Sequence, residues 1–98
     1  MLVLARMDVT FPESMDAATK ADFQAREKEY SGNLQSRGVM KGIWRVVGEY
    51  ANYSIFDVDS HDEFHEILSG FPMFPYMNVK VTPLAKHPNA TTDDFFSA

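Results

Sequence analysis

The sequence predicts an α+β fold with the element order β-α-β-β-α-β, and the spacing of apolar residues carries this prediction. Strand-like patterns occupy residues 2–11, 43–47, 50–58 and 77–81, while helical spacing occupies residues 17–37 and 60–71. This order is the ferredoxin-like arrangement, a four-stranded antiparallel sheet with two helices on one face.

The first strand and the first helix are marked by their periodicities. Apolar and polar residues alternate along residues 2–11, which is typical of a strand. Ser14 or Asp16 is expected to cap a helix that runs from residue 17 to about residue 37 and stops at Gly38.

The first helix has two contrasting faces. The face expected to pack on the sheet contains Phe23, Glu27, Tyr30 and Leu34. The opposite face contains small residues, namely Ala18, Ala21, Ala25 and Gly32. These small residues either allow close approach of another element or simply face solvent.

A hairpin is expected over residues 43–47 and 50–58, which are rich in β-branched and aromatic residues. Gly48-Glu49 fits a type II′ turn, with glycine first. The resulting register places Arg45 opposite Asn52.

The second helix should begin at the capping-box pattern Ser60–Glu63. Its apolar stripe comprises Phe64, Ile67, Leu68 and Phe71. An aromatic, proline-containing turn over residues 71–76 then leads into the last strand. We expect a single domain over residues 1–88 and a polar tail over residues 89–98, which includes Phe95 and Phe96.

Composition excludes several classes of protein. The 98 residues are 45% hydrophobic and 23% charged with a net charge of −5, which disfavours disorder and nucleic-acid or anionic-membrane binding. No apolar run reaches the roughly 20 residues that a membrane span needs. The start of the chain lacks a signal-peptide pattern and cysteine is absent, so we expect a cytoplasmic protein.

Both faces of the predicted hairpin are apolar, although two helices can cover only one face of the sheet. One hairpin face is expected to contain Ile43, Val47 and Phe56, and the other Trp44, Val46, Tyr53 and Ile55. A large apolar sheet face is unfavourable in water, so we expect the sheets to pair between subunits of a homodimer or a larger closed assembly.

Glu27 is the strongest candidate for chemistry, because it lies in the helical stripe that should face the sheet. A partly buried carboxylate has a raised proton affinity, which suits a general base. The alternative is a structural ion pair with Arg45 or Lys20.

Arg45, Tyr50 and Asn52 share one sheet face in the predicted register. If the helices cover this face, the three side chains converge beneath Glu27 and suit a small anionic carbonyl compound. The alternative is a cross-strand polar pair beside a half-buried tyrosine. Lys28 is as compatible with a solvated side chain as with a ligand contact.

His61 and His65 are one helical turn apart, a spacing that can hold a metal ion, but two ligands are too few to predict a metal site. His65 lies at the edge of the apolar stripe, where it could line a pocket. No phosphate-binding loop, nucleophile elbow or basic aromatic patch is present.

Several segments together resemble the muconolactone Δ-isomerase family of the β-ketoadipate (catechol) pathway. They are Met1-Leu2, Glu27-Lys28, Trp44-Arg45, the segment GEYANYSIFDV at 48–58 and the segment FPMFPYM at 71–77. The resemblance covers residues 1 to about 88.

The resemblance implies a homodecamer built from dimers and a cofactor-independent, base-mediated 1,3 proton shift that turns muconolactone into 3-oxoadipate enol-lactone. It matches Glu27 to the family's candidate base and matches other positions to the pocket. We therefore expect Glu27, Tyr50 and Asn52 to be catalytic and Lys28 and Arg45 to bind the substrate, a lactone carboxylate, without metal. His65 is added to the substrate-binding residues because of its place beside the apolar stripe, not because of the resemblance.

Two alternatives stay open at the level of sequence. A chloromuconolactone dehalogenase would use the same scaffold and base, with chloride expelled from the oxyfuran anion. A member of the dimeric αβ-barrel proteins would be either a non-catalytic or binding protein, which keeps the paired sheets without this base, or a cofactor-free monooxygenase that acts on an aromatic polyketide.

Overall fold

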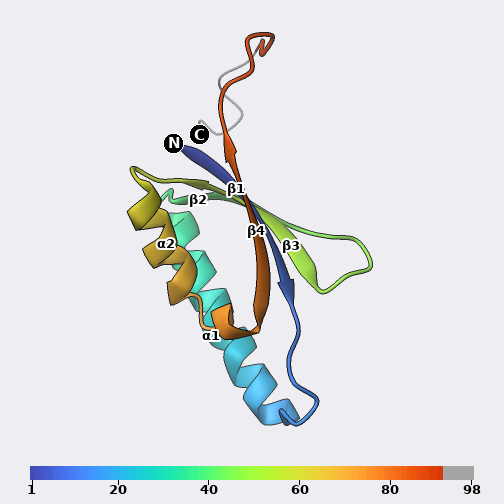
Figure 1. The fold of residues 1–98 in the computed structure, drawn as a ribbon. Helices are drawn as coiled ribbons and strands as arrows, with labels where there is room; N and C mark the ends of the chain where they lie inside the picture. Colours follow the sequence, from blue (N-terminus) through green and yellow to red (C-terminus); the bar gives the residue numbers. More distant parts are fainter. Residues whose placement is uncertain (92–98) are drawn as a thin grey trace.

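The computed structural model describes residues 1–91, and within them four strands and two α-helices follow the predicted order (Figure 1). The elements are β1 (Leu2–Val9), α1 (Ala17–Ser36), β2 (Met40–Arg45), β3 (Ala51–Asp57), α2 (His61–Gly70), the short 3-10 helix η1 (Phe74–Tyr76) and β4 (Met77–Leu84). Most of the expected tail, including Phe95 and Phe96, lies outside the described residues.

The strands form one antiparallel sheet in the order β2-β3-β1-β4, which confirms the ferredoxin-like prediction. β1 ends at Val9, earlier than predicted, whereas β4 continues through Pro83 to Leu84. Proline is tolerated there because β4 is an edge strand that pairs with β1 alone.

The hairpin has the predicted register but a different turn. Arg45 pairs with Asn52, as expected. However, the carbonyl of Val46 accepts a hydrogen bond from the N–H of Glu49, and Gly48 has a φ of +83°. The turn is therefore centred on residues 47–48 with glycine third, as in a type II turn, and the predicted type II′ turn is wrong.

Side-chain caps fix the start of both helices. Asp16 accepts a hydrogen bond from the N–H of Thr19 at 2.7 Å, and Ser60 accepts one from the N–H of Glu63 at 3.1 Å. Gly38, with a φ of +74°, follows the end of α1 as predicted.

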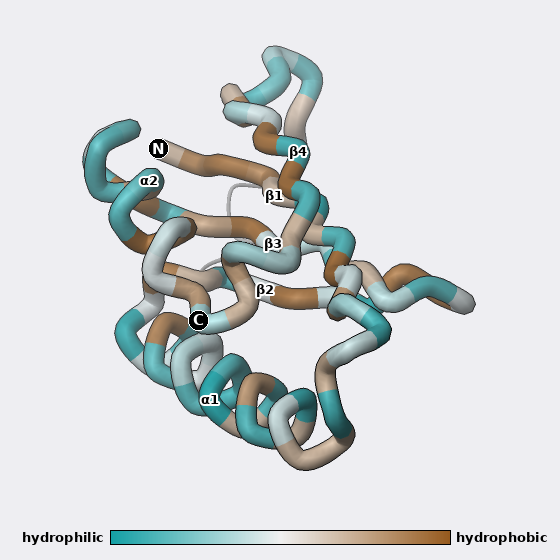
Figure 2. Tube along the Cα trace, turned by 60° about the horizontal axis from the view of Figure 1, so that its bottom comes forward, coloured by the Kyte–Doolittle hydropathy of each residue, from teal (hydrophilic) through white to brown (hydrophobic). Residues whose placement is uncertain are grey.

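Both helices pack on the same side of the sheet, and the apolar core lies between these two layers (Figures 1 and 2). The core residues are Val3, Ala5, Met7, Leu34, Met40, Phe56, Val58, Phe64, Ile67, Leu68 and Phe71. The predicted apolar stripe of α2 is buried in this core. Within residues 1–91, no helix is long and apolar enough to cross a membrane.

No helix within residues 1–91 covers the opposite face of the sheet. Trp44 and Tyr53, which are paired across β2 and β3, are 46% and 38% exposed. The hairpin part of this face exposes aromatic residues, as predicted, whereas Arg6 and Asp8 of β1 and Glu49 of the hairpin loop place charges beside Tyr53.

Candidate active site

A cavity of about 400 Å³ lies between α1, the β2-β3 hairpin and the turn that precedes β4. Its wall is formed by Met7, Val9, Gln24, Glu27, Lys28, Ser31, Met40, Ile43, Arg45, Tyr50, Ala51, Asn52, Ser54, Phe71, Met73 and Met77. Five of the six predicted site residues are therefore brought together, although they come from α1, β2, β3 and the hairpin loop.

The carboxylate of Glu27 is held at one oxygen and unpartnered at the other. Oε1 accepts a hydrogen bond from the backbone N–H of Met73 at 3.1 Å. Oε2 is buried without a hydrogen-bond partner, and none of the ion pairs within residues 1–91 includes Glu27. The structural ion pair with Arg45 or Lys20 is therefore not formed.

Burial raises the pKa of Glu27 above its usual value of 4.5. The N–H of Met73 and the nearby charge of Arg26 act in the opposite direction, but desolvation has the larger effect. A carboxylate of this kind is a stronger base than one in water, as proton abstraction requires.

The aromatic turn presents the Met73 N–H to Glu27. The carbonyl of Phe71 accepts from the N–H of Phe74, and the carbonyl of Met73 accepts from the N–H of Tyr76. The ring of Phe71 packs on the ring of Tyr30 of α1, with centroids 4.7 Å apart. The two hydrogen bonds hold the shape of the turn and the ring contact joins it to α1, so the N–H of Met73 is fixed relative to the carboxylate.

Arg45 and Asn52 are adjacent on the helix-covered face of the sheet, as the predicted register requires. The guanidinium carbon of Arg45 lies 5.3 Å from the ring centroid of Tyr50. The hydroxyl of Ser54 donates to Oδ1 of Asn52 at 2.8 Å. The site thus combines a cation with an amide whose oxygen is already engaged.

Tyr50 is held to α1, because its hydroxyl oxygen accepts a hydrogen bond from Nε2 of Gln24 at 3.2 Å. Since the oxygen is the acceptor in this bond, the phenolic proton is left to be donated elsewhere. Within residues 1–91, no described hydrogen bond uses that proton.

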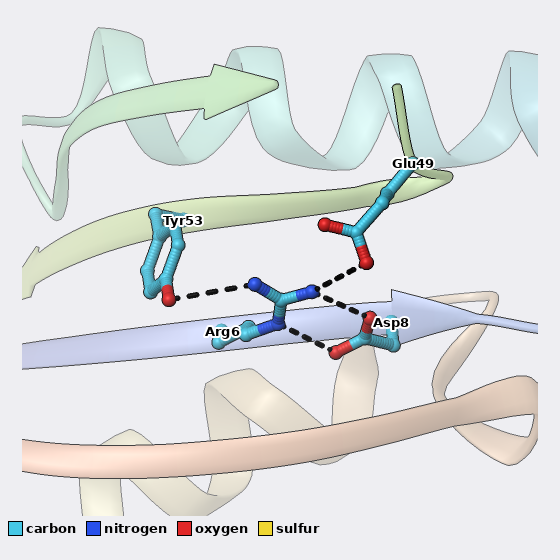
Figure 3. A network of polar contacts seen from close by, with 4 residues as sticks. All are labelled: Arg6, Asp8, Glu49 and Tyr53. Atoms are coloured by element: carbon cyan, nitrogen blue, oxygen red, sulfur yellow. Dashed lines mark hydrogen bonds and ion pairs between the residues drawn. The ribbon is translucent and has the colours of Figure 1, made fainter. Parts of the chain in front are cut away.

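The hairpin loop that carries Tyr50 is also fastened on the opposite face of the sheet (Figure 3). Arg6 of β1 donates to Glu49 at 3.1 Å, to Asp8 at 3.0 and 3.1 Å, and to Tyr53 at 3.5 Å. The hydrogen bonds from Arg6 and its positive charge lower the pKa of Asp8. The loop is therefore anchored through Glu49 on one face and through Tyr50 on the other.

The two remaining predicted binding residues have different positions. Lys28 lines the cavity from α1, although its side chain is exposed. His65 is exposed on α2 and does not line the cavity, so its predicted place in the pocket is wrong. His65 lies beside the apolar stripe of α2 but outside it. The stripe faces the sheet, so the side chain of His65 faces solvent. In the described part of the chain, no cluster of three or more His, Asp or Glu residues is suited to a metal ion.

Gln24, Ser54 and Met73 line the cavity but are not among the predicted site residues. Gln24 is one helical turn from Glu27, and Ser54 alternates with Asn52 on one strand face, so periodicity could have located both. The contribution of Met73 is a backbone N–H, for which side-chain identity gives no signal.

The arrangement is suited to proton transfer on a small anionic carbonyl compound. Glu27 supplies a base, Arg45 and Lys28 supply positive charge, and apolar residues line much of the remaining wall. Tyr50 and Asn52 supply neutral hydrogen-bond donors, which can stabilise an oxyanion that forms when Glu27 removes a proton.

Comparison with known proteins gives one consistent family. The family model described as muconolactone delta-isomerase matches residues 1–90. The muconolactone delta-isomerase of Cupriavidus pinatubonensis is 61% identical over 92% of this chain and 98% of its own length. That of Pseudomonas putida is 40% identical over 96% of this chain and 98% of its own.

A solved structure agrees with these sequence relationships. The crystal structure of a muconolactone isomerase superposes with a TM-score of 0.91 at 41% identity, covering 96% of this chain and 98% of the other. The relatives match across nearly the whole chain, including the segments that form the cavity. The chain belongs to the muconolactone delta-isomerase family.

Proposed function

We propose that this chain is an isomerase that converts muconolactone into 3-oxoadipate enol-lactone by a 1,3 proton shift, without a cofactor. The observation that carries the proposal is the buried, unpartnered Oε2 of Glu27 in the wall of a cavity that also contains Arg45. The membership of the family and the name shared by the curated relatives support the same reaction.

In the first step, Oε2 of Glu27 takes the proton from the ring carbon that bears the carboxymethyl group. The electron pair of that C–H bond moves through the ring to the lactone carbonyl oxygen, which gives an aromatic oxyfuran anion. Glu27 becomes neutral in this step, and its raised pKa favours the protonated form.

Stabilisation of the oxyanion is assigned to Asn52 and Tyr50. The Asn52 amide nitrogen has no described partner within residues 1–91, and the hydroxyl proton of Tyr50 is likewise available. Donors held in place before the reaction stabilise developing charge without reorganisation, and each contributes a factor of about 10² to 10³ in turnover.

The substrate carboxylate is assigned to Arg45 and Lys28. The protein has a net charge of −5, which opposes the approach of an anion. Two cations on the cavity wall offset this repulsion locally, and the planar guanidinium of Arg45 can bind a carboxylate through two hydrogen bonds.

In the second step, Glu27 returns the proton to the ring carbon next to the carbonyl, and the lactone is restored with its double bond moved. One carboxylate can serve both carbons because they lie on the same small ring. The Met73 N–H holds Oε1 during both transfers, so Oε2 remains the reacting oxygen.

Proton NMR of muconolactone with the enzyme in deuterated water tests this function. We expect migration of the ring double bond, with a deuterium content next to the carbonyl equal to the fraction of turnovers in which the proton on Glu27 exchanges with solvent before it is returned. Unchanged substrate at enzyme concentrations that should complete the reaction would contradict the proposal. With 5-chloromuconolactone, a faster release of chloride than isomerisation of muconolactone would instead indicate a dehalogenase.

Our proposal includes an assembly in which the uncovered sheet face of one chain packs on that of a second chain, within a homodecamer built from dimers. The exposed pair of Trp44 and Tyr53 supports this pairing, because exposed aromatic residues on an uncovered face favour association. We also propose a cytoplasmic location, since the sequence contains no cysteine.

A further inference from the structure

Ser54 is a buried hydroxyl in an otherwise apolar part of the sheet. Ser54 is 0% exposed, and no other polar or charged residue within residues 1–91 is buried to this degree. It pairs with Ala5 of β1 and Ile43 of β2. Burial of a hydroxyl among such neighbours is unfavourable unless it forms a hydrogen bond, so core packing alone would favour alanine here.

The hydroxyl of Ser54 forms its hydrogen bond with Asn52, two residues earlier on β3. The Oγ of Ser54 donates to Oδ1 of Asn52 at 2.8 Å, and both residues line the cavity. The amide of asparagine has an acceptor end and a donor end. Because Ser54 engages the oxygen, the two N–H groups of Nδ2 remain for another partner.

We infer that Ser54 is a positioning residue, whose hydroxyl holds the Asn52 amide with its N–H groups directed to the lactone oxyanion. This inference rests on the proposed function. Without Ser54, the terminal torsion of Asn52 has two broad orientations, and one of them presents oxygen to the oxyanion. An oxygen at that position would repel the developing charge, so the hydroxyl selects the productive orientation before substrate arrives.

A double-mutant cycle separates positioning from a general effect on the fold. We expect Ser54→Ala to lower kcat about tenfold with less than a twofold change in KM, and Asn52→Ala to lower kcat about 10²-fold. In the Asn52→Ala background, Ser54→Ala should change kcat by less than about twofold, because no amide is left to position.

Val58→Ala is the matched control, since it truncates another buried residue near β3 that does not line the cavity. It should lower the melting temperature at least as much as Ser54→Ala does but leave kcat unchanged. An equal loss of kcat from Ser54→Ala in both backgrounds would overturn the inference, and so would wild-type turnover in Ser54→Ala.

A second measurement needs no substrate and therefore does not depend on the reaction. In a ¹⁵N-labelled sample, the side-chain NH₂ resonances of Asn52 are identified as those that Asn52→Ala removes. We expect Ser54→Ala to shift or broaden them, because the amide loses its fixed orientation. Unchanged resonances would overturn the role of Ser54 and leave the proposed function intact. Absence of muconolactone turnover by the wild type would refute the proposed function itself.

Discussion

The Oε1 atom of Glu27 accepts a hydrogen bond at 3.1 Å from the backbone N–H of Met73, 46 residues later in the chain. This bond joins the middle of α1 to the turn between α2 and β4. It leaves Oε2 as the buried oxygen without a partner within residues 1–91. The two oxygens of one carboxylate therefore have separate roles, since one is anchored and the other is available as a base.

Replacement of Glu27 by glutamine should abolish most turnover and preserve the fold. The glutamine oxygen can still accept from the N–H of Met73, but an amide cannot remove a proton from carbon. We expect kcat for muconolactone to fall about 10²-fold or more. The matched control is Glu29→Gln, which is exposed on α1 outside the cavity and should retain normal turnover. Turnover of Glu27→Gln near the wild-type rate would remove Glu27 from the mechanism.

The same variant should be more stable than the wild type at neutral pH. The pKa of Glu27 is raised in the folded chain, so the folded state favours the protonated carboxyl more than the unfolded state does. Stability from this residue is therefore fully present below about pH 4.5, the unfolded value, and is lost as pH rises through the folded pKa. Glutamine is neutral at every pH and avoids this loss.

Urea unfolding of wild type and Glu27→Gln across pH 4 to 8, at matched protein concentration, measures the effect. The free energy of unfolding should favour the variant at pH 7 to 8, and the difference should shrink toward pH 4. Glu29→Gln should stay within about 0.5 kcal/mol of wild type, as is usual for exposed sites. A difference for Glu27→Gln that does not depend on pH would contradict the raised pKa.

Replacement of Arg45 by alanine should weaken substrate binding more than it slows the chemical step. A hydrogen-bonded charge pair with the substrate carboxylate is lost, which should raise KM about tenfold or more. Lys41→Ala removes the same positive charge from an exposed residue of β2 that does not line the cavity. If both variants raise KM equally, the effect is one of overall charge, and Arg45 does not bind the carboxylate.

Introduction of a charge on the uncovered sheet face should dissociate the assembly. Trp44→Glu places a carboxylate on the face proposed to pair with a second chain, where burial of an unpaired charge is strongly unfavourable. We expect light scattering to give a mass well above the 11.1 kDa of one chain for the wild type and a smaller mass for the variant. Gln35→Glu adds the same charge on the exposed side of α1 and should leave the mass unchanged. A monomeric wild type at micromolar concentration would contradict the proposed pairing.

The order of elements, the register of the β2-β3 hairpin and the likeness to a family were all determined by the sequence itself. The caps at Asp16 and Ser60, and the pairing of Arg45 with Asn52, followed from local rules about periodicity and turns. These features depend on residues that are close together in the chain. The turn at Gly48 was predicted one residue too late, because glycine allows a positive φ at more than one position of a turn.

Only the tertiary structure decided which residues share the cavity and how each is held. His65 had a plausible position at the edge of a helical stripe, yet the packing of α2 leaves it outside. The anchor of Glu27 at Met73 and the tie between Tyr50 and Gln24 join segments that are far apart in the chain. Periodicity determines the face on which a side chain lies, whereas the partner of that side chain depends on how separate elements pack. Every residue except proline has a backbone N–H, so residue type does not show which N–H holds Glu27.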